Sequence, residues 1–555
     1  MRKALFLSLF AAIAATAQVS GPIVTTSSAM AVSQSMETLG RMDPANLYRG
    51  LGGYVERSHS VPKIPPETKG FVPAPLVSVP ANTPYNQTAN YQPLGAAISA
   101  NFDGLGLGTP SFAITGAPPD TTMGVSPTQI VQWVNSQYAV FDKLGNKLLG
   151  GTGFLPGNAI WAALPTGSLC RDFNRGDPMV QYDRIADRWI LSQFAFNAGL
   201  TLNAQCFAVS TTNNALGTYN LYQFDFGNVL PDYAKLGVWP DAYYTTYNMF
   251  TTGATFAGGR ACAYDRAQML LGNVATSVCF NSLSRFAYLP SDFDGTTPPP
   301  VGTPNYHISW DWTVVNPPYT MQLTKFVPNF LVPANSTFTD GFGGAALSFV
   351  AFPLDANTVA PCNDSPNACV PQLGTTQKLD TLGDRHMYRL VYRNFGTHDS
   401  LLFTQSVDIN PAAPVAQLRW WEIRNPGANP PVVYQNSTYN PNATFRWMGS
   451  AAFDKLGNIG IGFSASSATM NPAIRIAGRR RTDPINLLRT EQTVIAGAGS
   501  QGAVATSLSR WGDYSAMQID PADDCTFWYT TQYIGANGTF NWSTRIASFK
   551  FPNCN

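Results

Sequence analysis

Charged residues are scarce in this sequence, and after its first residues it has no long apolar stretch. Asp, Glu, Lys and Arg make up 12% of the 555 residues, against about 25% in an average soluble protein. The net charge is +1 and the basic residues are scattered, so no nucleic-acid partner is expected. We interpret the one basic cluster, residues 479–481, as a solvated turn. Because no later stretch offers about 20 apolar residues, we also expect no membrane span in the mature protein.

Sequence motifs of several common chemistries are missing as well. The chain contains no HExxH motif, no P-loop and no G-x-S-x-G elbow, which disfavours a zinc peptidase, a P-loop nucleotide site and an α/β-hydrolase. It contains no CxxC or CxxCH motif, which disfavours a thioredoxin-like site and covalently bound haem. We also find no cofactor-binding repeat of a quinone-dependent dehydrogenase. No cofactor is therefore evident from the motifs.

Residues 1–17 have the features of a secretory signal peptide. Two cations follow Met1, an apolar stretch covers residues 4–15, and an A-x-A site stands at 15–17. An apolar stretch of about a dozen residues is too short to cross a bilayer. We therefore expect cleavage before Gln18 and a mature protein that is secreted or periplasmic.

The eight cysteines form an even set, which in an exported protein favours disulfides over metal binding. Pairing by proximity along the chain is one of many possible connectivities. It predicts the bonds Cys170–Cys206, Cys262–Cys279, Cys362–Cys369 and Cys525–Cys554.

The chain changes character near residue 108. Residues 18–108 are rich in Ser, Thr and Pro, which predicts an extended leader, partly packed on the main domain. Residues 109–555 contain short runs rich in Val, Ile, Tyr, Phe and Trp, such as 130–134 and 526–530. These runs have strand length and strand composition, and long helical periodicity is missing. We therefore expect an all-β domain.

Repeated openings predict how those strands are arranged. Gly-Asp precedes a strand-like run at 176–177, 383–384 and 512–513, and related openings occur at 118–124, 237–244, 290–295 and 445–450. The intervals are long enough for four strands each. A fixed-period repeat of antiparallel strands is typical of a β-propeller, here with seven blades of four strands. A β-sandwich or several small β domains are the alternatives. The identical strings at 141–146 and 453–458 are each expected to form a hairpin turn.

The openings also carry a resemblance. The strings at 119–125, 239–241, 446–449 and 510–514 resemble those of a broad group of exported bacterial propeller proteins, described as sialidase-like at the level of the fold. The resemblance covers the chain from about residue 101 to the C-terminus, and it implies a fold and export rather than a reaction. An Arg-Ile-Pro motif and Asp boxes of a true sialidase are absent, so cleavage of sialic acid is disfavoured.

Five aspartates are candidate catalytic residues because the innermost strands of a propeller begin around one central mouth. They are Asp120, Asp177, Asp241, Asp384 and Asp513. Two such carboxylates could act as acid and as base or nucleophile on a glycosidic bond. A cluster of them could hold Ca²⁺, or each could only cap its own turn.

Candidate substrate-binding residues stand at equivalent blade positions. Arg446 and Arg510 could bind a carboxylate, and Trp447 and Trp511 could stack on a sugar ring. In the alternative interpretation the tryptophans pack between blades and the arginines neutralise the aspartates. Among the histidines, 59, 307, 386 and 398, only His386 is expected near the mouth.

Two functions remain open from the sequence. The first is a glycan-cleaving enzyme, a hydrolase or lyase, that acts on an extracellular polysaccharide. The second is a non-catalytic propeller that binds a glycan, a protein or another envelope component. We expect a monomer in either case.

Overall fold

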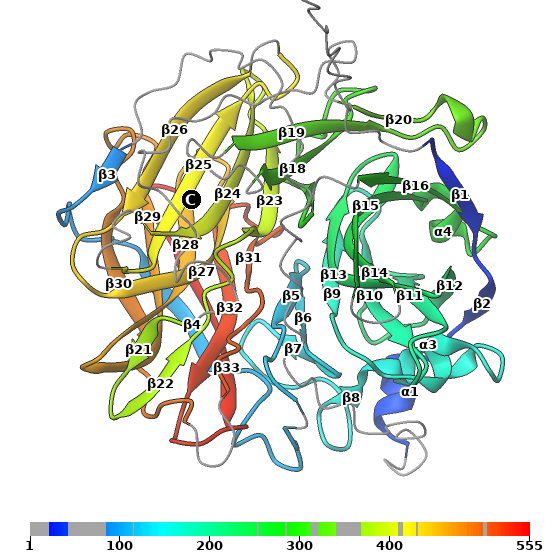
Figure 1. The fold of residues 1–555 in the computed structure, drawn as a ribbon, viewed down its shortest axis with the longest axis horizontal. Helices are drawn as coiled ribbons and strands as arrows, with labels where there is room; N and C mark the ends of the chain where they lie inside the picture. Colours follow the sequence, from blue (N-terminus) through cyan, green and yellow to red (C-terminus); the bar gives the residue numbers. More distant parts are fainter. Residues whose placement is uncertain are drawn as a thin grey trace, which may run out of the picture.

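The structure is a computed structural model, and its elements are almost all strands (Figure 1). The residues that it describes are 21–42, 85–114, 116–251, 255–282, 286–311, 320–339, 368–408, 414–428, 431–502 and 508–555. The expected signal peptide and Cys362 lie outside the described residues.

Most strands belong to antiparallel meanders that follow one another along the chain. The first meander comprises β5 (Thr122–Val125), β6 (Gln129–Val134), β7 (Gln137–Asp142) and β8 (Leu155–Pro156). The second comprises β9 (Met179–Asp183), β10 (Arg188–Phe196), β11 (Asn203–Ser210) and β12 (Tyr219–Gly227). The third comprises β13 (Val229–Val238), β14 (Ala242–Thr251), β15 (Thr255–Asp265) and β16 (Thr276–Ser282). The next comprises β17 (Leu289–Asp294), β18 (Asn305–Asp311), β19 (Thr320–Val327) and β20 (Thr337–Thr339).

The later meanders continue in the same way. They comprise β23 (His386–Asn394), β24 (Asp399–Val407), β25 (Gln417–Arg424) and β26 (Val432–Tyr439); β27 (Phe445–Phe453), β28 (Ile459–Ser467), β29 (Met470–Arg479) and β30 (Arg489–Ile495); and β31 (Ala516–Ile519), β32 (Phe527–Ile534) and β33 (Trp542–Lys550). A separate hairpin is formed by β21 (Val370–Gln372) and β22 (Thr375–Leu379).

The first strands of the meanders surround a common centre. Contacts run from β5 to β9, β13, β17, β23, β27 and β31 in turn and return to β5. This radial repetition of antiparallel sheets is the arrangement of a β-propeller, and Figure 1 views it along the short axis of the molecule. One departure from separate blades is the parallel pairing of β17 with β23, which joins two meanders into a nine-stranded sheet.

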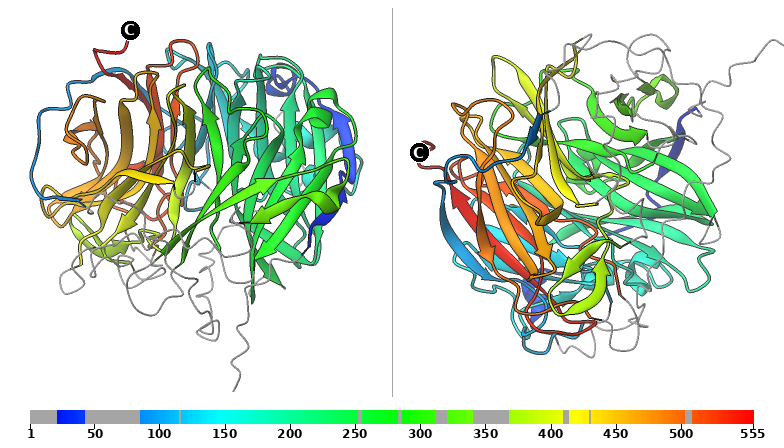
Figure 2. Two further views of the ribbon diagram at one scale, coloured as in Figure 1. Left: turned by 90° about the horizontal axis from the view of Figure 1, so that it is seen from above. Right: turned by 60° about the vertical axis from the view of Figure 1, so that its left-hand side comes forward.

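N-terminal segments complete the outer edges of several sheets. Strands β1 (Ile23–Thr26) and β2 (Ala29–Val32) pair with β16 and β12, and they lie at the outer edge in Figure 2. Strand β3 (Tyr85–Gln87) pairs in parallel with β26, and β4 (Ala97–Asp103) pairs antiparallel with β33. Residues 21–42 and 85–103, within the stretch expected to form a leader, therefore cover sheet edges. Because β4 pairs with β33, a segment that precedes the first meander in the sequence supplies the fourth strand of the last sheet.

Helices are short and lie between strands. They are α1 (Met36–Gly40), α3 (Leu169–Asp172) and α4 (Arg266–Leu271), with 3₁₀ turns η2 (Gly157–Ala163) and η3 (Pro333–Asn335). No helix in the described ranges is long and apolar enough to cross a membrane.

Three of the four expected disulfides are confirmed. They are Cys170–Cys206, Cys262–Cys279 and Cys525–Cys554. Cys369 is also disulfide-bonded. The bond Cys525–Cys554 ties the turn between β31 and β32 to the end of the chain. Such bonds are typical of proteins from oxidising compartments.

The two identical strings form the same hairpin turn, as expected. Asp142 Oδ1 accepts hydrogen bonds from the backbone N–H groups of Leu144 and Asn146, each at 2.9 Å. Asp454 Oδ1 accepts the corresponding bonds from Leu456 and Asn458, again at 2.9 Å. The repeated sequence is therefore explained by turn formation.

Candidate functional site

Lys235 lies at the centre of a cluster of charged residues near the beginning of the first strands. It is fully buried, and it follows a bulge in β13, where the pairing with β14 shifts between Asp232 and Lys235. Tyr233 within this bulge has a φ of 56°. A bulge bends the strand and redirects the following side chain, so it accounts for the position of Lys235.

Aromatic rings and carboxylates surround the Lys235 ammonium group. Its Nζ lies 3.4 Å from the centre of the Tyr233 ring and 4.1 Å from that of Tyr514, and it donates a hydrogen bond to the Ala234 carbonyl at 2.9 Å. Burial lowers the pKa of Lys235 to about 8, although Asp177, Asp513 and Asp120 act in the opposite direction. We call the charged and aromatic residues at this place the Lys235 cluster. Its members are Lys235, Tyr233, Tyr514, Asp120, Asp177, Asp232, Asp384, Asp513, Arg385 and Arg510.

Asp177 carries a proton more readily than an ordinary carboxyl group. Burial, followed by the charge of Asp232, raises its pKa to about 7, while Lys235 acts in the opposite direction. Its Oδ2 accepts a hydrogen bond from the backbone N–H of Tyr233 at 2.9 Å. A pKa near the working pH is the property that a general acid or base requires.

Arginines bind two other aspartates of the cluster. Arg385 donates to both carboxylate oxygens of Asp384, at 2.7 and 2.9 Å, and Arg510 donates to both oxygens of Asp513. The exposed fractions of Asp177, Asp384 and Asp513 are 6%, 7% and 5%, whereas Lys235 is fully buried. All four side chains are therefore almost completely buried.

Backbone geometry explains why Gly-Asp recurs in the sequence. Asp120, Asp177 and Asp513 have φ values of 47°, 46° and 58°, and Gly176 and Gly512 have 99° and 66°. Glycine adopts this left-handed region freely, and aspartate is among the side chains that tolerate it. Turn formation therefore accounts for the motif. The hydrogen bonds described above nevertheless link Asp177 to β13 and Asp513 to Arg510.

Two residues that the sequence predicted for the site, Asp241 and Arg446, lie outside the Lys235 cluster. Asp241 was expected to begin a first strand; this placement is wrong, because Asp241 lies in the turn between β13 and β14. It is exposed and accepts a hydrogen bond from the Tyr244 hydroxyl at 3.1 Å. Arg446 is fully buried and bonds to both carboxylate oxygens of Glu491, at 2.7 and 2.9 Å.

The remaining aromatic candidates belong to the core. Trp447 and Trp511 are 0% and 1% exposed, and their ring centres are 5.6 Å apart. This is the packing that the alternative interpretation predicted. His386 is fully buried against Phe403 and Trp421, and burial lowers its pKa to about 3.

Sequence reasoning missed the lysine and tyrosines of the cluster. Arg385 and Tyr514 directly follow the predicted Asp384 and Asp513, so the repeated openings could have drawn attention to them. Lys235 and Tyr233 have no such signal, because the bulge that places them has no recognisable pattern in the sequence.

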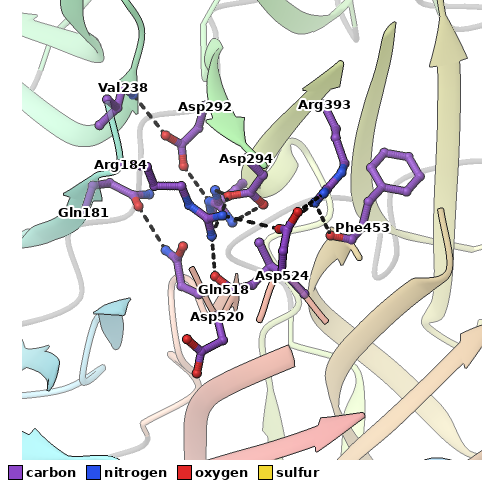
Figure 3. Close-up of polar contacts among 12 residues, drawn as sticks. Gln181, Arg184, Val238, Asp292, Asp294, Arg393, Phe453, Gln518, Asp520 and Asp524 are labelled. Atoms are coloured by element: carbon purple, nitrogen blue, oxygen red, sulfur yellow. Dashed lines mark hydrogen bonds and ion pairs between the residues drawn. The ribbon is translucent and has the colours of Figure 1, made fainter. Parts of the chain in front are cut away.

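A second charged network joins the first strands β17, β23 and β31. Figure 3 shows four of its members, Asp292, Asp294, Arg393 and Asp524. Arg389 on β23 bonds to Asp292 and Asp294 of β17, at 2.6 and 2.8 Å, and to the Met517 carbonyl of β31 at 2.9 Å. Arg393, which lies farther along β23, donates hydrogen bonds to Asp524 in the turn between β31 and β32. These ion pairs therefore join different meanders.

Metal binding was one possible use of the aspartates. Within the described ranges, no three His, Cys, Asp or Glu side chains are arranged to hold a metal ion. In the Lys235 cluster, lysine and arginine cations occupy the positions beside the carboxylates, and they oppose Ca²⁺ binding by charge repulsion.

Comparisons with known proteins give no family. The sequence matches no protein-family model and no curated protein. Similar solved structures include an α-L-arabinanase of Penicillium chrysogenum complexed with arabinobiose, with 8% identity and a TM-score of 0.34 over 83% of this chain and 100% of that chain. The polysaccharide lyase Uly1 has 11% identity and a TM-score of 0.37 over 80% of this chain and 91% of its own.

A third similar structure is a subtype N10 neuraminidase-like protein (little yellow-shouldered bat, Guatemala). It has 9% identity and a TM-score of 0.32 over 65% of this chain and 94% of its own. At such scores these likenesses assign neither a family nor an activity to this chain.

Proposed function

We propose that the protein is an exported, seven-bladed β-propeller that cleaves glycosidic bonds at the Lys235 cluster, by hydrolysis or elimination. The observation that carries the proposal is the raised pKa of Asp177, about 7, beside Asp513 with its arginine partner. Two carboxyl groups in different environments can divide the roles of acid and base. The signal-like N-terminus and the three disulfides support export.

Hydrolysis would use the two groups as follows. Protonated Asp177 gives its proton to the leaving glycosidic oxygen as the bond to the anomeric carbon breaks. Asp513, which accepts hydrogen bonds from Arg510, takes a proton from the water whose oxygen bonds to that carbon.

Elimination would use Lys235 instead of Asp513. Its pKa of about 8 leaves a fraction of the amine neutral near pH 7. The neutral amine would take the proton beside a uronate carboxylate, a C–C double bond would form, and Asp177 would protonate the departing oxygen.

A non-catalytic glycan-binding protein is the second candidate. The observation that favours it is that the carboxylates of Asp384 and Asp513 are both held by arginines and are at most 7% exposed. Such a site could present fixed hydrogen-bonding groups to a ligand without moving a proton.

The test is a panel of neutral and acidic polysaccharides incubated with the full-length mature protein. New reducing ends indicate hydrolysis, and ultraviolet absorbance of unsaturated products indicates elimination. Asp177→Asn should lower the rate by about 10²-fold or more while binding persists. Asp103→Asn is the matched control, because the Asp103 side chain is 68% exposed on β4, and it should keep full activity.

Two results would count against catalysis. One is a panel without products but with measurable binding, which supports the second candidate. The other is cleavage that Asp177→Asn leaves unchanged, which would place the chemistry elsewhere in the molecule.

A further inference from the structure

A second pocket, here called the arginine pocket, lies beside the turn between β23 and β24. It encloses about 250 Å³, and its lining includes Arg424, Arg479, Arg481, Tyr434, Phe395 and His398. The basic cluster 479–481 was interpreted as a solvated turn. That interpretation is wrong for Arg479, which is 3% exposed because it lies at the end of β29 with its side chain in the pocket wall.

Positive charge exceeds negative charge in the arginine pocket. Glu422 is the carboxylate of the lining, and its Oε1 accepts from Arg424 Nε at 2.6 Å. Arg479 Nη2 donates to the Asp483 carbonyl at 2.6 Å, but its buried Nε has no hydrogen-bond partner. The Arg481 side chain makes no hydrogen bond or ion pair among the described residues. Arg479 Nε and the Arg481 side chain are therefore donors that an anion in the pocket could use. Such an anion would also remove the cost of the buried Arg479 Nε, which has no partner.

Aromatic rings lie beside these cations. The Arg424 guanidinium lies 3.2 Å from the centre of the Tyr434 ring. Phe395 and His398 stack with ring centres 5.1 Å apart and an interplanar angle of 25°. A ligand that fits this lining has an anionic group for the guanidinium groups and a ring whose apolar face can pack on an aromatic side chain.

The arginine pocket is separate from the Lys235 cluster. Asp384 of the cluster precedes β23, whereas Phe395 of the pocket follows its last residue. Nine residues of extended strand span about 30 Å, so the two sites lie near opposite ends of the first strands. A molecule in one site therefore does not touch the other.

We propose that the arginine pocket binds the carboxylate or sulfate group of an acidic saccharide, with Arg424, Arg479 and Arg481 as its anion-binding side chains. The guanidinium groups hold the anion, and the sugar ring packs against Tyr434 or Phe395. This binding does not depend on cleavage at the Lys235 cluster.

The test compares three sugars that differ in one substituent, by isothermal titration of the full-length mature protein at low salt. Glucuronate and glucose 6-sulfate should bind, and glucose should bind at least about tenfold more weakly, because a hydrogen bond to a charged group is lost. The relative affinities of the first two distinguish a carboxylate from a sulfate ligand. Equal binding of glucose and both acidic sugars would overturn the proposal.

Substitutions locate the binding. Arg481→Gln and Arg424→Gln should each weaken binding of the acidic sugar about tenfold, and both affect partly exposed side chains. Arg41→Gln is the matched control, because the Arg41 side chain directly follows α1, is 73% exposed and is not part of the pocket lining; this variant should bind normally. Unchanged affinity in both pocket variants would also overturn the proposal. Asp177→Asn should bind as the unmodified protein does, so failure of the catalytic proposal leaves this one testable.

Discussion

Replacing Arg389 by methionine should destabilise the ring more than any exposed arginine substitution does. The guanidinium joins β23 to β17 and β31 through Asp292, Asp294 and the Met517 carbonyl. Arg389, Asp292 and Asp294 are each at most 2% exposed. Methionine keeps much of the side-chain volume but removes the charge and the donors, so two buried carboxylates lose their main cation.

The size of the effect follows from what each carboxylate retains. Asp292 keeps one hydrogen bond, from the Val238 backbone N–H at 3.0 Å. Asp294 keeps Arg184, whose Nη2 lies 3.5 Å from its Oδ1. Breaking a buried ion pair by removing one partner costs about 3–5 kcal/mol, and the remaining contact to Arg184 places the expected loss near the lower value.

The penalty should also depend on pH. Arg389 and Arg184 oppose the effect of burial and hold the pKa of Asp294 below its usual range, so without Arg389 this pKa rises. Protonation then removes the uncompensated charge, and the loss of stability shrinks as the pH falls.

Urea unfolding, followed by tryptophan fluorescence at pH 8 and pH 5, measures both effects. Arg545→Met is the matched control, because its partner Asp103 is 68% exposed, and it should cost less than about 1 kcal/mol. A loss below about 1 kcal/mol for Arg389→Met, or the same loss at both pH values, would refute the reasoning.

Three further predictions concern stability and proton binding. Replacing Cys525 and Cys554 together by serine removes a disulfide that links residues 29 positions apart. We expect the free energy of unfolding to fall by about 3–4 kcal/mol, which lowers the urea concentration at the midpoint of unfolding. An unchanged midpoint would contradict this prediction. Folding raises the pKa of Asp177 to about 7, so the native state binds this proton more tightly, and the contribution of Asp177 to the free energy of unfolding falls as the pH rises from about 4 to 7. Asp177→Asn should remove this part of the pH dependence of stability. A pH profile of stability identical to that of the unmodified protein would argue against it. Gly462→Ala should lower the free energy of unfolding by about 1–3 kcal/mol, because a Cβ there would overlap the Tyr529 ring. Gly374→Ala is the comparison variant: its Cβ would meet open space, but its φ is 73°, so its effect measures backbone strain alone.

The first strands could be predicted from the sequence, because their openings repeat. Asp177, Asp384 and Asp513 lie two or three residues before the beginning of β9, β23 and β31. The left-handed backbone at Asp177 and Asp513 requires glycine or a tolerant residue. The string Trp239-Pro240-Asp241 resembles these openings, yet it forms a turn one strand later. Proline and aspartate favour any tight turn, so this composition does not distinguish the beginning of a blade from its first hairpin.

The partners of the buried charged side chains could not be predicted, because they lie far away in the sequence. Arg446 on β27 pairs with Glu491 on β30, three strands farther along the same sheet. Lys235 occupies the centre of the cluster because of a bulge in β13. Neither the pairing nor the bulge leaves a local pattern, whereas turn residues and disulfide spacings do.

The two ends of the first strands differ in charge, and this difference separates the proposed roles. In the Lys235 cluster the described carboxylates outnumber the cations: Asp120, Asp177, Asp232, Asp384 and Asp513 stand against Lys235, Arg385 and Arg510. In the arginine pocket three guanidinium groups stand against Glu422. The surplus of carboxylates helps to keep Asp177 protonated, and of the two proposed routes it favours hydrolysis of a neutral glycan over elimination from a uronate.

Salt distinguishes these two sites. Raising the ionic strength from about 0.01 M to 0.15 M shortens the screening length from about 30 Å to about 8 Å. Binding of glucuronate to the partly exposed arginine pocket should therefore weaken with salt. Cleavage of a neutral glycan at the Lys235 cluster should change little, because its charges are buried and its substrate has none. An equal salt dependence of both would contradict this division, because the exposed and the buried charges would then be screened alike.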